Sequence, residues 1–428
     1  MSSILPTRST RLAVPRRNRV PPAITRGPEN MPGAGILEEI PGDLGVTLWR
    51  SVRNVALWAA TPPHKRGGLF CGTAANVREA DVGGLQVDAE LVAPLSVMVR
   101  LLESPAAMDV PRLVNACRRI SAWAEQRGSL ATALEFMQAA AQVAPQVAAL
   151  AYGVGRLARR RAEYDRAESW YGRAIVQARR SRDWRIYALS YSGLGNLNTQ
   201  KGNFPIARRA QIRGLRATLR HNLTDLQGIA FHDLFATHVE TGAHDEATAL
   251  AARAFQAYGP THPYLPRLAF DVAFHWMEQG FFNEALRVAK ALEPCFTAPT
   301  ESALALSLIA RTAGGTGDRD AFDYARGKLT ALLQTGCGED AAARALLGIS
   351  YGAASLGEWQ LAETSAVEAL EIARERREGK MEMAAEAALE FARRRAQQRT
   401  SARSKQRDAA LAEDFVRALR QRPGLVPA

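Results

Sequence analysis

Cysteine, lysine and aromatic residues are scarce in this sequence, and long apolar runs are missing. The four cysteines lie far apart in 428 residues without a CxxC pair, which argues against a disulfide framework and against a cysteine-rich zinc site. The same cysteine usage predicts a reducing, cytoplasmic location. No stretch approaches the roughly 18 apolar residues that span a bilayer, so no transmembrane helix is expected. Aromatics make up only 7%, while alanine is abundant, as in closely packed helices.

The formal net charge of +12 is located at the two ends of the chain. Residues 1–28 contribute +6 and residues 374–428 contribute another +6, so the residues between them are formally neutral. The body of the protein therefore has no basic field that would attract nucleic acid, and contact with a polyanion is expected only through the tails. Nearly all the basic residues are arginine, and together with the alanine content this skew indicates a G+C-rich, bacterial genome.

Both ends are predicted to lie outside the main body of the protein. Residues 1–35 hold six prolines among arginine and serine without an apolar face, so we expect a disordered basic leader. This composition would also suit an organelle transit peptide. Residues 374–428 are predicted to form a basic helical C-terminal cap and tail, with a last short helix at 409–419.

Residues 36–110 are predicted to form an N-terminal helical capping region. Apolar residues at helical spacing predict one helix over residues 44–60 and a second over residues 88–102. The glycine-rich stretch between them, residues 61–87, is expected to be a loop.

Residues 111–373 contain seven copies of one short pattern, spaced 34 to 40 residues apart. Each copy has a glycine, or once Ala162, followed five residues later by a central residue that is usually alanine. Three residues before the central residue lies what we call the plug position, which is bulky in most copies. Another small residue usually lies twelve residues before the central one. The central residues are Ala133, Ala167, Ala207, Ala247, Ala285, Phe322 and Ala362.

Helical hairpins explain these residue types. Small residues on both helices let the two axes approach to about 8–10 Å, and glycine accepts the positive φ of the turn between them. The bulky residue at the plug position would fill the gap to the next hairpin. The sixth copy departs from the pattern, because Phe322 is its central residue and no bulky residue precedes it, so a kink or local break is expected there.

This pattern resembles the tetratricopeptide repeat over about 260 residues. The closest matches to its consensus are Ala133, Ala140 and Pro145 in the first copy, and Gly155, Tyr164, Ala167 and Ala174 in the second. The copies of 37 to 40 residues resemble those of bacterial regulatory members. The resemblance implies an all-α fold, a right-handed α-solenoid of about seven hairpins, with the first helix of each pair lining a concave groove.

The residues of the first helices that point into this groove are predicted to bind a partner there. The side chains at these positions change from basic through polar to acidic along the chain. This gradient would orient a bound protein or peptide segment with its acidic end toward residues 118–160. A solvated face without a ligand is the alternative. The predicted groove residues are Arg118, Arg119, Tyr152, Arg156, Arg159, Asn196, Gln200, Asp233, Arg267, Asp271 and Phe274.

Some tetratricopeptide proteins bind C-terminal carboxylates through a clamp of lysine, asparagine and arginine. Here Asn196 matches one clamp asparagine and Arg267 roughly matches a lysine. Asp233 and Asp271 stand where the clamp has a neutral and a basic residue, and they would repel a carboxylate. The resemblance therefore does not extend to this function.

Catalytic and cofactor motifs are not found in the sequence. His232, His238 and His244 recur every six residues, about 120° apart on a helix, so they are not expected to share a metal ion. The glycine run at residues 314–317 lacks the spacing, the hydroxyl residue and the preceding strand of a phosphate-binding loop. We therefore expect no enzyme, no cofactor and no metal.

The sequence favours a non-enzymatic scaffold or adaptor for protein–protein interaction, which binds a protein or peptide segment in its groove. Two alternatives stay open. One is a peptide- or metabolite-sensing regulatory protein, although no helix-turn-helix DNA reader is found at either end. The other is nucleic-acid contact through the basic tails. The sequence leaves the oligomeric state undefined.

Overall fold

The computed structural model describes residues 33–85, 87–334, 341–375, 379–394 and 409–421. Every regular element in these residues is a helix, which confirms the all-α prediction. Contacts divide the chain into two compact units, one ending at Leu226 and the other beginning at Gln227. The sequence did not predict this division, which falls near the start of a helix. The expected disordered leader lies outside the described residues, except for residues 33–35.

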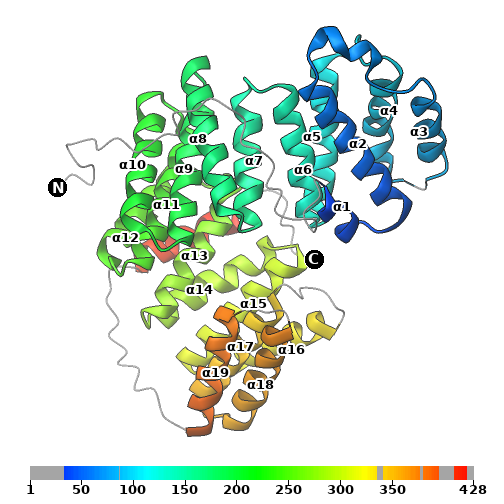
Figure 1. The fold of residues 1–428 in the computed structure, drawn as a ribbon. Helices are drawn as coiled ribbons and strands as arrows, with labels where there is room; N and C mark the ends of the chain where they lie inside the picture. Colours follow the sequence, from blue (N-terminus) through cyan, green and yellow to red (C-terminus); the bar gives the residue numbers. More distant parts are fainter. Residues whose placement is uncertain (1–32, 86, 335–340, 376–378, 395–408, 422–428) are drawn as a thin grey trace. The chain divides into compact units, whose positions relative to one another are not determined.

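The first unit consists of helices that follow one another in antiparallel pairs (Figure 1). Its elements are α1 (Ala34–Glu39), α2 (Gly42–Ala60), the 3-10 helix η1 (Pro63–Gly68), α3 (Ala74–Gly83), α4 (Ala89–Glu103), α5 (Val110–Gln126), α6 (Leu130–Val143), α7 (Ala148–Arg160), α8 (Tyr164–Ser181), α9 (Trp184–Gln200) and α10 (Phe204–Arg220). The helix α11 (Thr224–Glu240) begins in this unit and continues into the second.

The second unit repeats the same arrangement. Its further elements are α12 (His244–Tyr258), α13 (Leu265–Glu278), α14 (Phe282–Leu292), the 3-10 helix η2 (Glu293–Cys295), α15 (Pro299–Thr316), α16 (Arg319–Gln334), α17 (Ala342–Ser355), α18 (Trp359–Glu375), α19 (Gly379–Arg394) and α20 (Ala409–Arg420). The predicted helical hairpins are therefore all present, from α5/α6 to α17/α18.

The turn of every hairpin has the backbone conformation that its glycine was expected to adopt. φ is positive at all seven turn positions, including Ala162 at +58°. The central residues on the second helices are all fully buried, Phe322 included. Gly155 shows why the matching position on the first helix is small, since a Cβ there would lie 2.8 Å from the ring of Tyr171. The repeat register read from the sequence is thus confirmed.

Serine at the small position of a first helix adds a hydrogen bond to this close packing. Ser121 Oγ donates to the carbonyl oxygen of Ala133 at 2.7 Å, and Ser350 Oγ donates to that of Ala362 at 2.8 Å. The same bond thus links the two helices of the first and of the last hairpin.

The kink expected in the sixth copy is not found. The helix α15 runs without interruption to Thr316, Gly317 takes the turn at φ +77°, and α16 follows. Phe322 fits because Gly352 on α17 lacks a side chain, and a Cβ there would lie 2.8 Å from the Phe322 ring. The larger central residue is therefore compensated by a glycine on the following helix.

The N-terminal helices pack against the first hairpin of the array. Helix α2 contacts α6 and α4 contacts α5. The carboxylate of Glu39 accepts hydrogen bonds from the backbone N–H groups of Ala131 and Thr132 at 2.7 and 2.8 Å, so α1 caps the start of α6. The helices predicted over residues 44–60 and 88–102 are confirmed as α2 and α4.

The expectation of a loop over residues 61–87 is corrected by α3 and η1. Helix α3 was missed because it has no apolar stripe and is fixed by polar tertiary contacts. The buried Arg78 donates to the carbonyl oxygen of Thr47 on α2 at 3.0 Å and lies 3.9 Å from Asp81. Residue periodicity cannot reveal a helix that is fixed in this way.

The two C-terminal helices occupy different places within the second unit. Helix α19 packs against α18 and α17 at the end of the array, as a cap would. Helix α20 instead packs against α14 and α13. Its Phe415 is fully buried, with its ring centroid 4.8 Å from that of Phe255 and 6.5 Å from that of Trp276.

Candidate functional site

The predicted groove residues are divided between the two units. Arg118, Arg119, Tyr152, Arg156, Arg159, Asn196 and Gln200 belong to α5, α7 and α9 of the first unit, whereas Asp233, Arg267, Asp271 and Phe274 belong to α11 and α13 of the second. All of them are at least partly accessible to solvent, as the predicted register requires.

The arginines of α7 are bound to an acidic residue of the preceding first helix. Arg156 makes a bidentate ion pair with Glu125 of α5, at 2.5 and 2.6 Å, and Arg160 shares the same carboxylate at 2.5 Å. The hydrogen bonds from Arg156 hold the pKa of Glu125 below its usual value. Glu125 thus neutralises part of the predicted basic end and links two neighbouring hairpins.

The other predicted residues of the first unit lie in different surroundings. Arg118 is exposed on α5, and its neighbour Arg119 donates to the carbonyl oxygen of Glu90 at 3.3 Å. Asn196 accepts a hydrogen bond from Gln211 of α10 at 3.2 Å, so part of its amide is engaged within its own hairpin. The Tyr152 ring lies 6.1 Å from that of Tyr171. Arg159 is half-buried on α7, and Gln200 is exposed at the end of α9.

The two predicted acidic residues of the second unit lie in different surroundings, and the charge of Asp271 is balanced by neighbouring groups. Asp271 Oδ2 lies 3.3 Å from Arg267 Nε and 3.0 Å from His232 Nε2. Asp233 is half-buried on α11, and its charge contributes to the raised pKa of Tyr258, of which burial is the main cause. Phe274 is exposed on the same helix as Arg267, one turn beyond Asp271.

Phe274 lines a cavity of about 610 Å³, which we call the groove cavity. This volume lies in the range typical of ligand pockets, about 300–1,000 Å³. The cavity is lined mainly by the first helices α13, α15 and α17. Helices α15 and α17 contribute the same four register positions, and α13 contributes two of these positions. These residues are Phe270 and Phe274 on α13, Leu304, Ser307, Leu308 and Arg311 on α15, and Arg344, Leu347, Gly348 and Tyr351 on α17.

The contributions of α15 and α17 were missed because the register was read only as far as the fifth copy. Relative to the central residues, Leu304 and Arg344 correspond to Arg267, and Arg311 and Tyr351 correspond to Phe274. Extending the same spacing to the last two copies would have found them.

Two arginines give the groove cavity its cationic groups. Arg311 Nη2 binds Glu278 at 2.8 Å, and its guanidinium lies 4.5 Å from the centre of the Tyr351 ring. Arg344 is exposed near the start of α17, and no ion pair of its side chain is found with the described residues. Glu240 and Glu278, the last residues of α11 and α13, supply acidic groups at another part of the wall.

The histidines lie in separate environments, as their spacing predicted. His232 contacts Asp271, while His238 is buried with Nδ1 2.7 Å from the carbonyl oxygen of Leu234. His244, at the plug position of the fourth copy, is exposed and stacks on the buried His275 of the next hairpin with ring centroids 5.3 Å apart. No group of three or more potential metal ligands comes together within the part of the chain that the structure describes.

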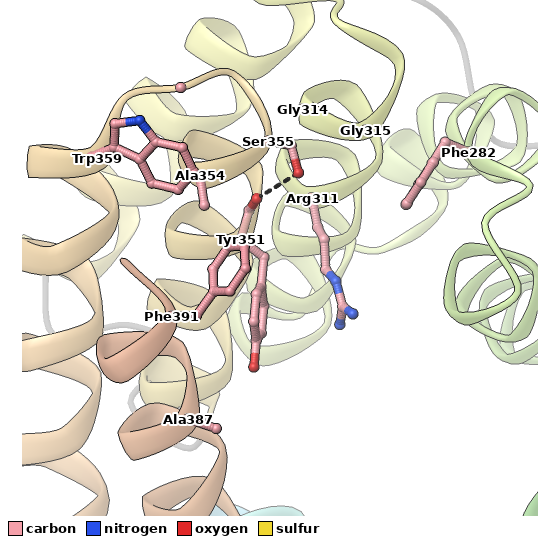
Figure 2. Close-up of a pocket in the computed structure, with 11 residues that line it drawn as sticks. Phe282, Arg311, Gly314, Gly315, Tyr351, Ala354, Ser355, Trp359, Ala387 and Phe391 are labelled. Atoms are coloured by element: carbon pink, nitrogen blue, oxygen red, sulfur yellow. Dashed lines mark hydrogen bonds between the residues drawn. The ribbon is translucent and has the colours of Figure 1, made fainter. Parts of the chain in front are cut away.

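A second cavity, of about 540 Å³, lies at the turn end of the last hairpins (Figure 2). We call it the plug cavity, because the plug residues of the fifth and seventh copies, Phe282 and Trp359, both line it. Tyr351 and Phe391 add two more aromatic walls, and Arg311 and Tyr351 line both cavities.

The glycine run at residues 314–317 has a packing role. Gly314 and Gly315 lie inside α15, and Gly317 takes the turn. A Cβ at Gly314 would lie 2.3 Å from the carbonyl oxygen of Gly352, and one at Gly315 would lie 2.5 Å from the Phe282 ring. These glycines allow α15 to approach α17 and α14 closely, which explains their density without a phosphate ligand.

No helix among the described residues is long and apolar enough to cross a bilayer. No protein-family model matches the chain, and no curated protein matches it. A solved structure of a Rap protein complexed with competence and sporulation factor is 10% identical and covers 78% of this chain and 98% of its own, with a TM-score of 0.44. The solved structure of a circular tandem repeat protein is 14% identical and covers 88% of this chain and 99% of its own, with a TM-score of 0.16. At these scores neither likeness carries an inference about family or function.

Proposed function

We propose that this protein is a non-enzymatic scaffold or adaptor that binds a protein or peptide segment on the face formed by its first helices. The observation that carries the proposal is the groove cavity, most of whose lining residues come from three successive first helices, α13, α15 and α17. We also infer that the hairpins are of the tetratricopeptide type, since the small, turn and central positions all serve the packing roles that this repeat requires.

The chemistry of the groove cavity suits a segment with apolar and charged side chains. Phe270, Phe274, Leu304 and Leu347 line the cavity with apolar groups, of which Phe270 and Leu347 are buried and Phe274 is the most accessible. An accessible apolar group within a concave site is typical of binding surfaces. Phe274 is 38% exposed, although it is large and apolar. Arg344 can bind an acidic group of the ligand, which would fix its direction.

Substitution of Phe274 tests the proposal directly. Peptides are first selected from a random library on the purified protein, and their affinities are measured by fluorescence polarisation for the wild type and for Phe274→Asp. We expect the substitution to weaken binding at least about tenfold, because a carboxylate replaces an accessible apolar contact of the site.

A matched control is Leu219→Asp, since Leu219 on α10 is similarly exposed, at 42%, and lies outside the groove cavity. This variant should bind the selected peptides as the wild type does. The proposal fails if no peptide binds saturably, or if both aspartate variants lose the same affinity. The charge reversal Arg156→Glu is a poorer test, because the new glutamate would face Glu125 and disturb the link between α5 and α7.

Nucleic-acid binding by the C-terminal arginines has less support. Arg393 pairs with Glu363 at 2.8 Å, Arg394 with Glu390 at 2.5 Å, and Arg417 with Asp414 at 3.3 Å. These pairs neutralise part of the positive charge that the sequence places at this end. The basic residues between positions 395 and 407 lie outside the described residues.

A further inference from the structure

We propose that the plug cavity is a socket for an aromatic side chain of the bound segment. This inference rests on the proposed function, because the aromatic ring would belong to the segment that is bound at the neighbouring groove cavity. The repeat pattern, the aromatic walls and the position of Arg311 support the socket independently of each other.

The repeat pattern shows which kind of group fits at this place in the array. The plug position holds Tyr164, Phe204, Phe282 and Trp359 in the second, third, fifth and seventh copies, and each of these side chains is half-buried. In the sixth copy the position is Arg319, which is exposed and forms an ion pair with Glu358. The sixth copy therefore lacks an aromatic plug, and the plug cavity is lined by the plug residues of the two copies on either side of it, Phe282 and Trp359.

The walls of the cavity suit a planar ring. Figure 2 shows Trp359, Tyr351 and Phe391 on one side and Phe282 on the other, with Arg311 between them. The rings of Trp359 and Phe391 are tilted at 60°, with centroids 6.1 Å apart. Aromatic groups favour such edge and offset contacts with a further ring. A volume of about 540 Å³ leaves room for one large side chain and part of its backbone.

Arg311 connects the socket to the groove cavity. Its guanidinium is held by Glu278 on one side and lies over the Tyr351 ring on the other, so its position is fixed before any ligand arrives. A guanidinium can stack on a ligand ring as well as on Tyr351. Because Arg311 and Tyr351 line both cavities, a segment on the first-helix face can insert a side chain into the socket without crossing to another surface.

Titration with N-acetyl-tryptophanamide, followed by ligand-observed NMR, tests the socket without any knowledge of the natural partner. The wild-type protein should bind this probe saturably, with a dissociation constant of about 1 mM, as expected for so small a ligand. N-acetyl-alaninamide, which has no ring, should not bind. In Arg319→Phe the missing plug is restored, so the probe should bind at least about tenfold more weakly while the thermal midpoint rises.

A second variant, Ala387→Phe, fills the socket from α19 at an exposed position and should give the same loss of binding if Arg319→Phe folds poorly. Arg209→Phe on α10 is the matched control and should bind the probe as the wild type does. Absence of saturable binding to the wild type overturns the proposal, as does unchanged binding in both filled variants. Indole is a second probe, and binding of indole without the capped tryptophan would exclude a peptide as the source of the ring. Either failure leaves the Phe274 test of the proposed function unaffected.

Discussion

Ala162 is the one turn residue of the seven hairpins that is not glycine, yet its φ is +58°. A residue with a Cβ pays about 1 kcal/mol in this conformation, whereas glycine loses more backbone entropy on folding. We therefore expect Ala162→Gly to stabilise the first unit by a net value of about 0.5 kcal/mol. Urea unfolding followed by circular dichroism measures this change.

The reverse substitution in the next copy is the control. Gly202 has φ +72°, and a Cβ there would meet no atom within 4 Å, so only the backbone conformation opposes an alanine. Gly202→Ala should therefore destabilise the protein while Ala162→Gly stabilises it. A lower stability of Ala162→Gly would show that conformational strain at Ala162 does not limit the turn.

His275 on α13 makes the stability of the second unit dependent on pH. Burial, with a smaller contribution from His244, lowers the pKa of His275 to about 4, whereas histidine in an unfolded chain has a pKa of about 6.5. Between these values the unfolded state binds more protons, so stability is full above pH 6.5 and falls as the pH drops toward 4. We expect this group to account for a loss of about 3 kcal/mol by pH 4.

Urea unfolding of the wild type and of His275→Gln at pH 7 and pH 4.5 measures that contribution. The difference in stability between the two pH values should be smaller in the variant. His64→Gln is the control, because His64 is exposed in η1 and should leave the pH dependence unchanged. An equal pH dependence in wild type and His275→Gln would contradict the assignment.

Among the elements, the sequence was most informative where packing depends on a repeated residue type. Turn glycines, central alanines and small residues on the first helices each have a local steric cause, so their spacing predicted seven hairpins. The plug position was informative even where its residue was unexpected, since Arg319 stands between the two copies whose plug residues, Phe282 and Trp359, line the plug cavity. What the sequence predicted wrongly there was the consequence, because α15 continues without interruption to Thr316.

Elements fixed by distant contacts were less predictable. Helix α3 depends on the bond from Arg78 to Thr47, and the place of α20 depends on Phe415 fitting beside Phe255 and Trp276. No local pattern contains this information. The same reason limits the candidate site: the register predicted which residues of α7 and α13 are accessible, but not that Glu125 engages Arg156 or that Glu278 engages Arg311.

For the whole molecule, the division into two compact units predicts that damage to one unit stays within it. Stability in a repeat array is approximately a sum of terms between neighbouring elements. Phe415 is fully buried against the second unit, so Phe415→Ala should cost about 3–5 kcal/mol there. Amide hydrogen exchange should then accelerate in α12, α13, α14 and α20 of this variant, while α5 to α8 keep their protection.

The reciprocal variant, Phe136→Ala, removes a fully buried ring from α6 in the first unit and should give the opposite pattern. Mass spectrometry of peptic fragments locates the exchange in both variants. Equal acceleration in both units after either substitution would mean that the array opens as one cooperative body. Faster exchange in the substituted unit alone would mean that each unit has its own stability. A ligand in the groove cavity would then protect the helices from α12 onward against exchange more than it protects α5 to α8.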